Sequence, residues 1–188
     1  MQHVILTRFN NGIYDRPDAD EWMNHRLELF KATKESVLSQ DAAFDWVVSF
    51  DPRTPQDLMD ELCPFPVMFP VTDLVQTFQP DGWLLSTRLD NDDILLPGAL
   101  EEIQTAAKMF KGREMVIDID YRKRDSKGVY PSNRPRANSP FLSLMSDRKN
   151  CYCRPHTFMP DDFPSYKVDK VLAEMVIHDR NVANTVNS

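Results

Sequence analysis

The sequence is short of glycine, cysteine and long apolar stretches, and each shortage excludes a class of protein. With five glycines among 188 residues, it has neither a P-loop nor a GxGxxG pattern, so no glycine-rich loop is available to hold a phosphate. No apolar run is long enough to cross a bilayer and no signal-peptide core follows Met1, so we expect a cytoplasmic protein without a transmembrane segment. The three cysteines, Cys63, Cys151 and Cys153, lack the spacing of a structural zinc site and are expected to be free thiols.

Positive charge is also scarce. The chain carries 22 lysines and arginines against 29 acidic residues, which gives a formal net charge of −7. Without a basic face it is not expected to bind nucleic acid, and an anionic ligand has to be held by a local group of cations. A length of 188 residues with 41% hydrophobic residues is enough for one sizeable core, so we expect a single domain.

Hydrophobic patterning predicts alternating strands and helices over the first 120 residues. Short apolar runs that end at turn-forming residues indicate strands, and apolar residues at helical spacing indicate helices. Turn-forming residues cluster over 122–138, which we interpret as a hairpin or mobile loop. The order predicts an α/β fold with a mostly parallel sheet and helices on both faces. Expected strands cover residues 3–9, 44–50, 67–69, 83–89, 115–119 and 150–154; expected helices cover 20–40, a short stretch from 54, and 97–111; residues 140–145 are helical or extended, and 168–177 form a further apolar element.

Acidic residues follow three of the predicted strands. Asp51 comes after the second strand, residues 90–93 come after the fourth, and Asp118 and Asp120 end the fifth. Ligands of open α/β sheets bind beyond the carboxyl ends of the strands, so these positions are the first candidates for a site. Clustered carboxylates repel one another unless a cation joins them, and hard oxygen ligands suit Mg²⁺ or Mn²⁺.

The most informative of these acids are Asp90 and Asp92, which form an Asp-x-Asp motif. A turning backbone can direct both carboxylates toward one cavity, where they hold a metal directly or through water. A metal there bridges the two phosphates of a nucleotide sugar and stabilises the departing diphosphate. A solvated acidic turn is the alternative for so short a motif. The apolar strand that begins at Trp83, and Arg88 two residues before the motif, favour the site.

Four blocks of the sequence resemble one family. They are HVILTRFN at residues 3–10, FDWVVSFD at 44–51, TRLDNDD at 87–93 and EMVIH at 174–178. Together they are similar to the rhamnosyltransferase group, which is itself similar to GT-A-type family 2 glycosyltransferases. The resemblance spans most of the chain. It implies a Rossmann-like GT-A fold, a nucleotide-diphosphate sugar donor, and metal-dependent transfer of the sugar to a saccharide or other hydroxyl acceptor.

The same resemblance implies roles for residues of the donor site. Asp51 matches the acid that contacts the base of the nucleotide, and Thr7 and Arg8 match the edge of the first strand that lines the same pocket. Arg88 and Asp90 complete the donor-binding residues.

The resemblance also implies a metal site. Asp90 and Asp92 match the metal motif, and His178 matches a late histidine that completes the Mn²⁺ or Mg²⁺ site in many GT-A enzymes. An ordinary surface histidine after a strand is the alternative for His178. We expect residues 168–177 to dock on the sheet and to deliver His178 beside the two aspartates.

The sequence departs from the family in its catalytic base. Inverting members use a carboxylate that deprotonates the acceptor hydroxyl, often in a Glu-Asp pair, and no such pair occurs here. Asp147 is the nearest candidate, with Glu174 and Asp120 behind it, and His156 is a candidate contact to phosphate or acceptor. The basic residues 122–124 with Lys127, Arg134 and Arg136 are a candidate lid over the donor phosphates, or simply a solvated loop.

The leading hypothesis is a metal-dependent, inverting glycosyltransferase. Residues 1–120 would form its nucleotide-binding part, and residues 121–188 its acceptor side with the basic loop and the C-terminal metal-site segment. A nucleotidyltransferase on a related fold is one alternative, although it would normally need a richer phosphate loop than residues 10–12 provide. A non-catalytic module that binds a nucleotide sugar is the other, because the Glu-Asp pair is missing.

Overall fold

The protein is described here by a computed structural model that covers residues 1–63, 66–67, 82–132 and 139–178. Within these residues the strands form one nine-stranded sheet in the order β3-β2-β1-β4-β8-β6-β9-β5, with β7 paired to β6. The strands are β1 (Gln2–Arg8), β2 (Asp45–Ser49), β3 (Pro66–Val67), β4 (Leu84–Arg88), β5 (Ile94–Leu95), β6 (Met115–Asp125), β7 (Gly128–Pro131), β8 (Leu142–Ser146) and β9 (Ser165–Val176). The helices are α1 (Ala19–Leu38), α2 (Gln56–Leu62), α4 (Ala99–Met109) and α5 (Met159–Asp162), with short 3₁₀ turns η1 (Ile13–Asp15) and η3 (His156–Phe158).

The sheet is mixed rather than mostly parallel. Strands β2 and β4 flank β1 and run parallel to it, as expected. The prediction fails in the second half, where β8 lies between β4 and β6 and is antiparallel to both. The reason is the connection: after β6 the chain turns back through the hairpin strand β7 instead of crossing over through a helix, and parallel neighbours require such a crossover.

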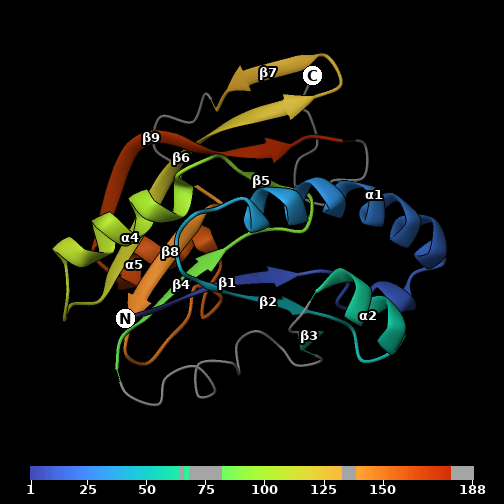
Figure 1. Cartoon of the computed structure of the whole chain (residues 1–188), viewed down its shortest axis with the longest axis horizontal. Helices are drawn as coiled ribbons and strands as arrows, with labels where there is room; N and C mark the ends of the chain where they lie inside the picture. Colours follow the sequence, from blue (N-terminus) through green and yellow to red (C-terminus); the bar gives the residue numbers. More distant parts are fainter. Residues whose placement is uncertain (64–65, 68–81, 133–138, 179–188) are drawn as a thin grey trace.

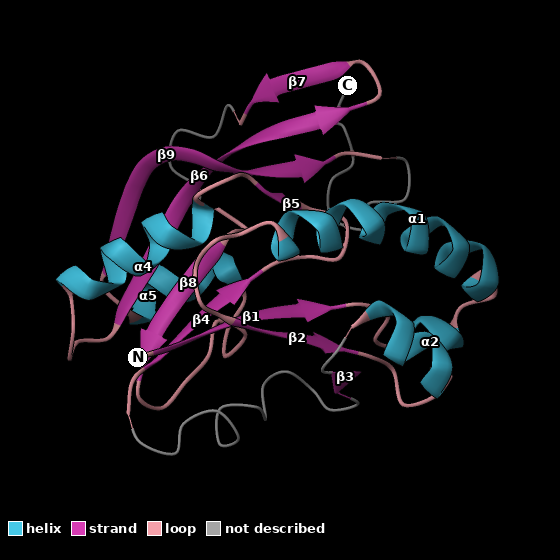
Figure 2. Ribbon diagram, viewed as in Figure 1, coloured by secondary structure: helices cyan, strands magenta, loops and turns pink. Residues whose placement is uncertain are grey.

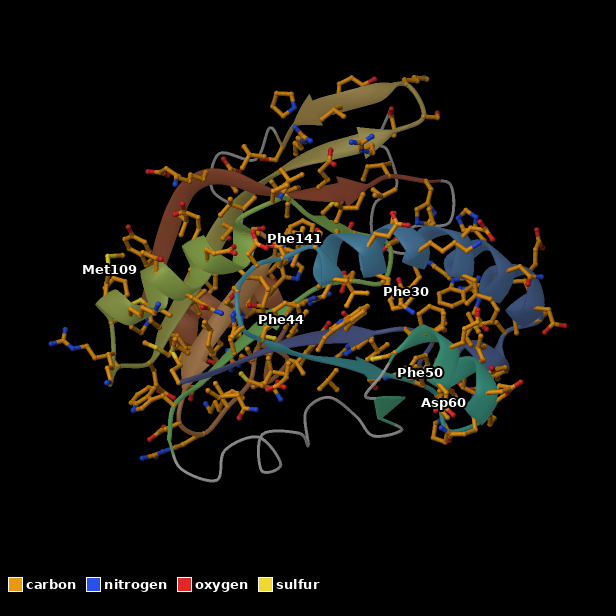
Figure 3. The ribbon with its side chains drawn as sticks, viewed as in Figure 1. Phe30, Phe44, Phe50, Asp60, Met109 and Phe141 are labelled. Carbon is orange, nitrogen blue, oxygen red and sulfur yellow. The ribbon has the colours of Figure 1, made fainter. Side chains whose placement is uncertain are left out.

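One face of the sheet, called here the α1 face, is covered by α1, α2 and α4 (Figure 2). Helix α1 turns one side to the sheet because Met23, Phe30 and Val37 recur at helical spacing and are all buried. Phe30 packs edge-on against Phe9, with ring centroids 5.0 Å apart. Figure 3 places Phe30, Phe50 and Phe141 among the side chains in this layer.

The opposite face, called here the α5 face, is covered by the segment 150–163. Its buried cluster joins Leu6 of β1, Leu84 of β4 and Leu144 of β8 to Met159 and Phe163. Helices therefore lie on both faces, as predicted, although α5, which covers this side, is short. The expected strand at 150–154 is wrong, because the Asn150 side chain and carbonyl accept hydrogen bonds from the backbone amides of Tyr152 and Cys153 and close a turn.

Strand β9 contains the apolar run expected at 168–177 and docks it within the sheet rather than on its surface. It runs parallel to β6, with register shifts between Ile119 and Asp120 and between Asp120 and Tyr121. The strand bends along its course in Figure 1. The hairpin alternative for residues 122–138 is confirmed where β6 and β7 pair; residues 133–138 and part of the expected strand 67–69 lie outside the described residues.

Candidate active site at the carboxyl edge of the sheet

The carboxyl ends of β1, β2 and β4 meet at one edge of the sheet, because these three strands are parallel neighbours. This brings Arg8, Asp51 and residues 90–93 to the same edge from three separate parts of the chain. Residues 90–93 form a turn between β4 and β5, in which the Asp93 amide donates to the Asp90 carbonyl at 3.3 Å. The edge is where ligands of such sheets bind.

On the α5 face, this edge carries two arginines that share one aromatic ring. The Arg8 guanidinium lies 4.1 Å from the centre of the Tyr152 ring and that of Arg88 lies 5.2 Å from it. Arg88 also donates to Asp90 at 3.2 Å and lies 3.4 Å from Nδ1 of His156. The buried Tyr152 hydroxyl donates to the Leu6 carbonyl at 3.3 Å, which fixes the ring beneath both cations. A cationic cluster therefore lies beside Asp90 in an acidic protein.

On the α1 face, Asp92 is held by a buried arginine and by the predicted histidine. Its Oδ2 accepts hydrogen bonds from Nη1 of Arg26, on α1, and lies 2.8 Å from Nε2 of His178, just after β9. Arg26 donates in addition to Asn91 Oδ1 at 3.1 Å, and the His178 ring lies 3.3 Å from His25. The structure thus delivers His178 beside Asp92 as expected, whereas the role of this pair in metal binding stays a prediction.

The two carboxylates of the Asp-x-Asp motif do not have the same surroundings. The partner of Asp90 comes from the α5 face, and the partners of Asp92 come from α1 and from the end of β9. The Asp90 side chain is 39% exposed and that of Asp92 is 8% exposed. Burial tends to raise the pKa of Asp92, but the hydrogen bonds from His178 and Arg26 hold it below the ordinary value. Asp92 is therefore a buried, ionised group, and Asp90 is the motif's contact with solvent.

Asp93 ties the acidic turn to β9. Its Oδ1 accepts the amide of Val176 at 3.0 Å. Complete burial, together with the charges of Asp92 and Asp90, raises the pKa of Asp93 well above its ordinary value. Asp93 accordingly has a structural role in the acidic run, through its hydrogen bond to β9.

Asp51 lies at the edge as expected, with both carboxylate oxygens already engaged. Oδ2 accepts the Gly12 amide at 3.0 Å, and the Arg53 amide and guanidinium donate to both oxygens at 2.9–3.0 Å. The hydrogen bonds from Arg53 outweigh burial and lower the pKa of Asp51. In this geometry Asp51 joins the loop after β1 to the loop after β2, and contact with a nucleotide base requires Arg53 to move. Its base-reading role stays a prediction.

Thr7 is placed in the core rather than in a pocket. It is fully buried, and its hydroxyl accepts a hydrogen bond from the Trp46 indole at 3.1 Å. The β1 residue that points to the cationic cluster is Arg8. Thr7 therefore supports the edge through packing, because alternate residues of a strand face opposite sides of the sheet.

The basic residues expected to form a lid are instead part of the β6–β7 hairpin where they are described. Arg122 and Arg124 donate to the buried carboxylate of Glu174 at 2.8 and 3.0 Å. This corrects the lid hypothesis for both arginines and also explains Glu174, which is a structural acid. Arg134 and Arg136 lie outside the described residues.

Asp147 lies at the opposite edge of the sheet from Asp90. It follows β8, whose last residue, Ser146, pairs with Leu84 at the start of β4, whereas Asp90 follows the end of β4. Six residues of extended chain separate Leu84 from Asp90, which corresponds to ~20 Å. Asp147 itself forms an ion pair with the adjacent Arg148. The antiparallel direction of β8 thus overturns the assignment of Asp147 as catalytic base.

Two residues of the site were missed by reading the sequence. Arg26 falls within the buried stripe of α1 between Met23 and Phe30, and a charge on the apolar side of a helix is the signal that it has a partner. Tyr152 had no such signal, because it lies in a turn that sequence patterning assigned to a strand.

The donor types at this edge suit a metal ion, although the protein gathers few of them in one place. Asp92 and His178 bring a carboxylate oxygen and an imidazole nitrogen together from distant parts of the chain. Among the described residues there is no group of three or more His, Cys, Asp or Glu side chains that could hold a metal ion. A metal held here would therefore need ligands beyond the protein, and Mg²⁺ sites commonly take theirs from substrate phosphates and water.

Comparisons with known proteins point to one fold. No protein-family model matches the chain, and no curated protein matches it. The crystal structure of residues 1–349 of TarS from S. aureus in complex with UDP matches with a TM-score of 0.54 at 12% identity, over 94% of this chain and 61% of that chain. A second crystal structure of TarS from S. aureus matches with a TM-score of 0.54 at 12% identity. The match covers 94% of this chain and 37% of that chain. The chain has the GT-A glycosyltransferase fold of TarS, and it spans about three fifths of the first of these structures.

The helices of the described residues were compared with the length and apolar character of a membrane-spanning helix. None of them is both long and apolar enough to cross a bilayer.

Proposed function

We propose that this chain is a glycosyltransferase that moves a sugar from a nucleotide-diphosphate donor to a hydroxyl acceptor. The observation that carries the proposal is the coincidence of two features. The chain shares its fold with a protein whose structure holds UDP, and the carboxyl edge of its sheet carries two arginines beside Asp90. A diphosphate needs cations in a protein with a net charge of −7.

In this proposal Arg8 and Arg88 hold the diphosphate on the α5 face. Both guanidiniums are oriented by the Tyr152 ring, so they are arranged before the ligand arrives. Their positive charge stabilises the negative charge that grows on the diphosphate as the sugar departs. Asp51, after the neighbouring strand β2, is proposed to contact the base of the nucleotide once Arg53 has moved from its carboxylate. Uracil or thymine, with a ring N–H, suits a carboxylate acceptor.

A divalent cation, Mn²⁺ or Mg²⁺, completes the proposed donor site. Of the three residues proposed to hold it, Asp92 and His178 already lie together, whereas Asp90 is paired with Arg88 and would have to turn toward them. When bound, the cation would supply a second positive charge for the leaving diphosphate. Arg26 already neutralises Asp92 in the structure. We therefore expect weak binding of the metal alone and stronger binding in the presence of the diphosphate, whose oxygens add ligands.

The transfer is proposed to be inverting, with direct attack of the acceptor hydroxyl on the anomeric carbon. Rhamnose is the sugar suggested by the family resemblance, whereas UDP, bound in the TarS structure, suggests a uridine diphosphate sugar. A rhamnose donor and a uridine diphosphate sugar differ in the nucleotide as well as in the sugar, so one screen of nucleotide sugars distinguishes the two.

The test is a thermal-unfolding screen of nucleotides and nucleotide sugars with and without Mn²⁺. A ligand that binds only the folded state raises the midpoint, by an amount that grows with its concentration over Kd. We expect UDP-sugars or dTDP-rhamnose to raise the midpoint more than ADP-glucose, and more with Mn²⁺ than without. A larger shift with UTP than with any diphosphate sugar would support a nucleotidyltransferase instead, and no shift with any nucleotide would reject the proposal.

A further inference from the structure

Strand β6 runs in register with β4, two strands away across β8. Thr87 of β4 and Ile117 of β6 both pair with Ser143 of β8, and β8 is antiparallel to both. The next residue of each outer strand in the same direction is Arg88 on β4 and Asp118 on β6. Two strand spacings separate them, which places their backbones ~10 Å apart.

Arg88 and Asp118 also leave the sheet on the same face. Leu84 and Val116 both belong to the buried cluster of the α5 face. Arg88 is four residues after Leu84 and Asp118 is two residues after Val116, and residues an even number of positions apart share a face of a strand. The contact of Arg88 with Tyr152 agrees with this placement. Asp118 therefore faces the cationic cluster from the other side of the apolar β8 residue Leu142.

The surroundings of Asp118 suit a carboxylate that gains and loses a proton. Its Oδ1 accepts the Ser139 amide at 3.1 Å. The charged groups that face it are Lys167, its partner on β9, and Asp120 on its own strand, which is itself engaged by the Ser132 hydroxyl and the Tyr121 amide. Burial outweighs the hydrogen bond from Ser139 and the charge of Lys167, and it raises the pKa of Asp118 to about 6. The pairing of β6 with β9 shifts register between Ile119 and Asp120, one residue beyond Asp118, and such irregularities are common beside functional sites.

We infer that Asp118 is the acceptor-side carboxylate of this site, and that it takes the proton of the acceptor hydroxyl. The inference rests on the proposed glycosyl transfer. The hydroxyl oxygen forms a bond to the anomeric carbon while the bond from that carbon to the diphosphate oxygen breaks. The bonding electron pair leaves with the diphosphate beside Arg88, and the hydroxyl proton passes to Asp118, which ends neutral. Substrate therefore extends between Arg88 of β4 and Asp118 of β6.

The experiment compares Asp118→Asn with Asp120→Asn and Asp169→Asn. Asp120 is the rival carboxylate on the same strand, and Asp169 is an exposed acid of β9 that serves as the matched control. Calorimetry measures the affinity for UDP. The turnover rate is measured as release of UDP from UDP-glucose or UDP-N-acetylglucosamine, and as release of dTDP from dTDP-rhamnose. Water or a methyl glycoside serves as the acceptor.

We expect Asp118→Asn to lower the turnover rate by a factor of about 10² to 10⁴ while UDP affinity changes less than about threefold. In the protein with Asp118 intact, kcat/KM should rise with pH through about 6 and then level off, because the base acts only when ionised. Asp169→Asn should keep full activity and the same pH profile. Unchanged turnover in Asp118→Asn, or loss of turnover confined to Asp120→Asn, would overturn the assignment.

Measurements on the intact protein distinguish failure of the proposed function from failure of the Asp118 assignment. If it binds no nucleotide and releases none, glycosyl transfer itself is wrong and the inference falls with it. If it binds UDP without measurable turnover, NMR titration of the Asp118 carboxyl carbon decides: a pKa near 6 that moves when UDP binds supports the inference, and a pKa at the ordinary aspartate value, or one that UDP leaves unchanged, overturns it.

Discussion

Asp90 and Asp92 are neighbours in one motif, but their removal has different costs. Asp92 is buried and paired with the buried Arg26, whereas Asp90 is partly exposed and paired with Arg88. Removing one partner of a buried ion pair leaves an uncompensated charge. We expect Asp92→Ala to lower the free energy of unfolding by about 3–5 kcal/mol, and Asp90→Ala by about 0–1 kcal/mol.

Urea unfolding at neutral pH measures both losses. The control is the double variant Arg26→Met/Asp92→Leu, which replaces the ion pair with apolar side chains and should recover most of the loss. Equal losses for Asp90→Ala and Asp92→Ala would contradict the difference in burial between the two carboxylates.

His178 provides the second test at the scale of a residue. If its imidazole is a metal ligand beside Asp92, His178→Ala should weaken Mn²⁺ binding in the presence of UDP by roughly tenfold or more. The measurement is a Mn²⁺ titration followed by electron paramagnetic resonance. His156→Ala is the control of the same residue type, since His156 lies beside Arg88 rather than Asp92. Equal Mn²⁺ affinity in His178→Ala and the intact protein would remove His178 from the metal site.

Reading the sequence located the edge of this site but not its internal contacts. Residues after strands can be found from patterning alone, which is how Asp51 and Asp90 were identified. Which groups neutralise a carboxylate depends on packing between elements distant in the chain, such as Arg26 with Asp92. Asp147 was misplaced because its position depends on the direction of β8, which residue patterning does not encode.

At the scale of the element, β9 holds the β6–β7 hairpin through Glu174. Burial tends to raise the pKa of Glu174, but hydrogen bonds from Arg124 and Arg122 lower it below the ordinary value. A carboxylate with a lowered pKa adds stability above its unfolded-state pKa, and this stability is lost as the pH falls through the folded-state pKa. Glu174→Gln should therefore cost about 1–3 kcal/mol at pH 7, with a smaller cost in acid.

The matched control for Glu174 is Glu102→Gln, whose partner Lys170 also belongs to β9 but whose ion pair is exposed. That change should cost about 0–1 kcal/mol at any pH. Chemical unfolding at pH 7 and pH 3.5 gives both values. A cost of Glu174→Gln that stays constant over this range would show that ionisation of Glu174 is not what stabilises the hairpin.

Elements with strong periodicity were predicted well, and those defined by pairing were not. Helix α1 was expected at residues 20–40 and is found at Ala19–Leu38, because its buried stripe is continuous. The two-residue strand β5 is too short to carry a pattern and exists because it pairs with β9. Strand β6 extends past its expected end at residue 119 because its polar second half, from Asp120 to Asp125, pairs with β7 and β9. Polar residues in a strand are stabilised by partners that sequence periodicity does not reveal.

At the scale of the whole molecule, one sheet carries both the proposed donor side and the proposed acceptor side of the site. The parallel strands β1, β2 and β4 bring the proposed donor-binding residues together, and β6 and β9 bring Asp118 and His178 to them from the later half of the chain. Strand β6 runs through residue 120 without interruption, so the two proposed parts of the domain share one strand. One continuous sheet gives both sides a rigid common support.

The central claim is that a nucleotide diphosphate binds at the carboxyl edge of the sheet beside Asp90. Isothermal titration of UDP in the presence of Mn²⁺ tests it most directly, with the intact protein, Asp90→Ala and the control Asp60→Ala. Asp60 is an exposed acid of α2, labelled in Figure 3, and it has no assigned role in the candidate site. We predict that Asp90→Ala weakens UDP binding by roughly tenfold or more, and that Asp60→Ala leaves it unchanged. UDP binding that is equally strong in all three proteins, or absent from the intact one, would contradict the claim.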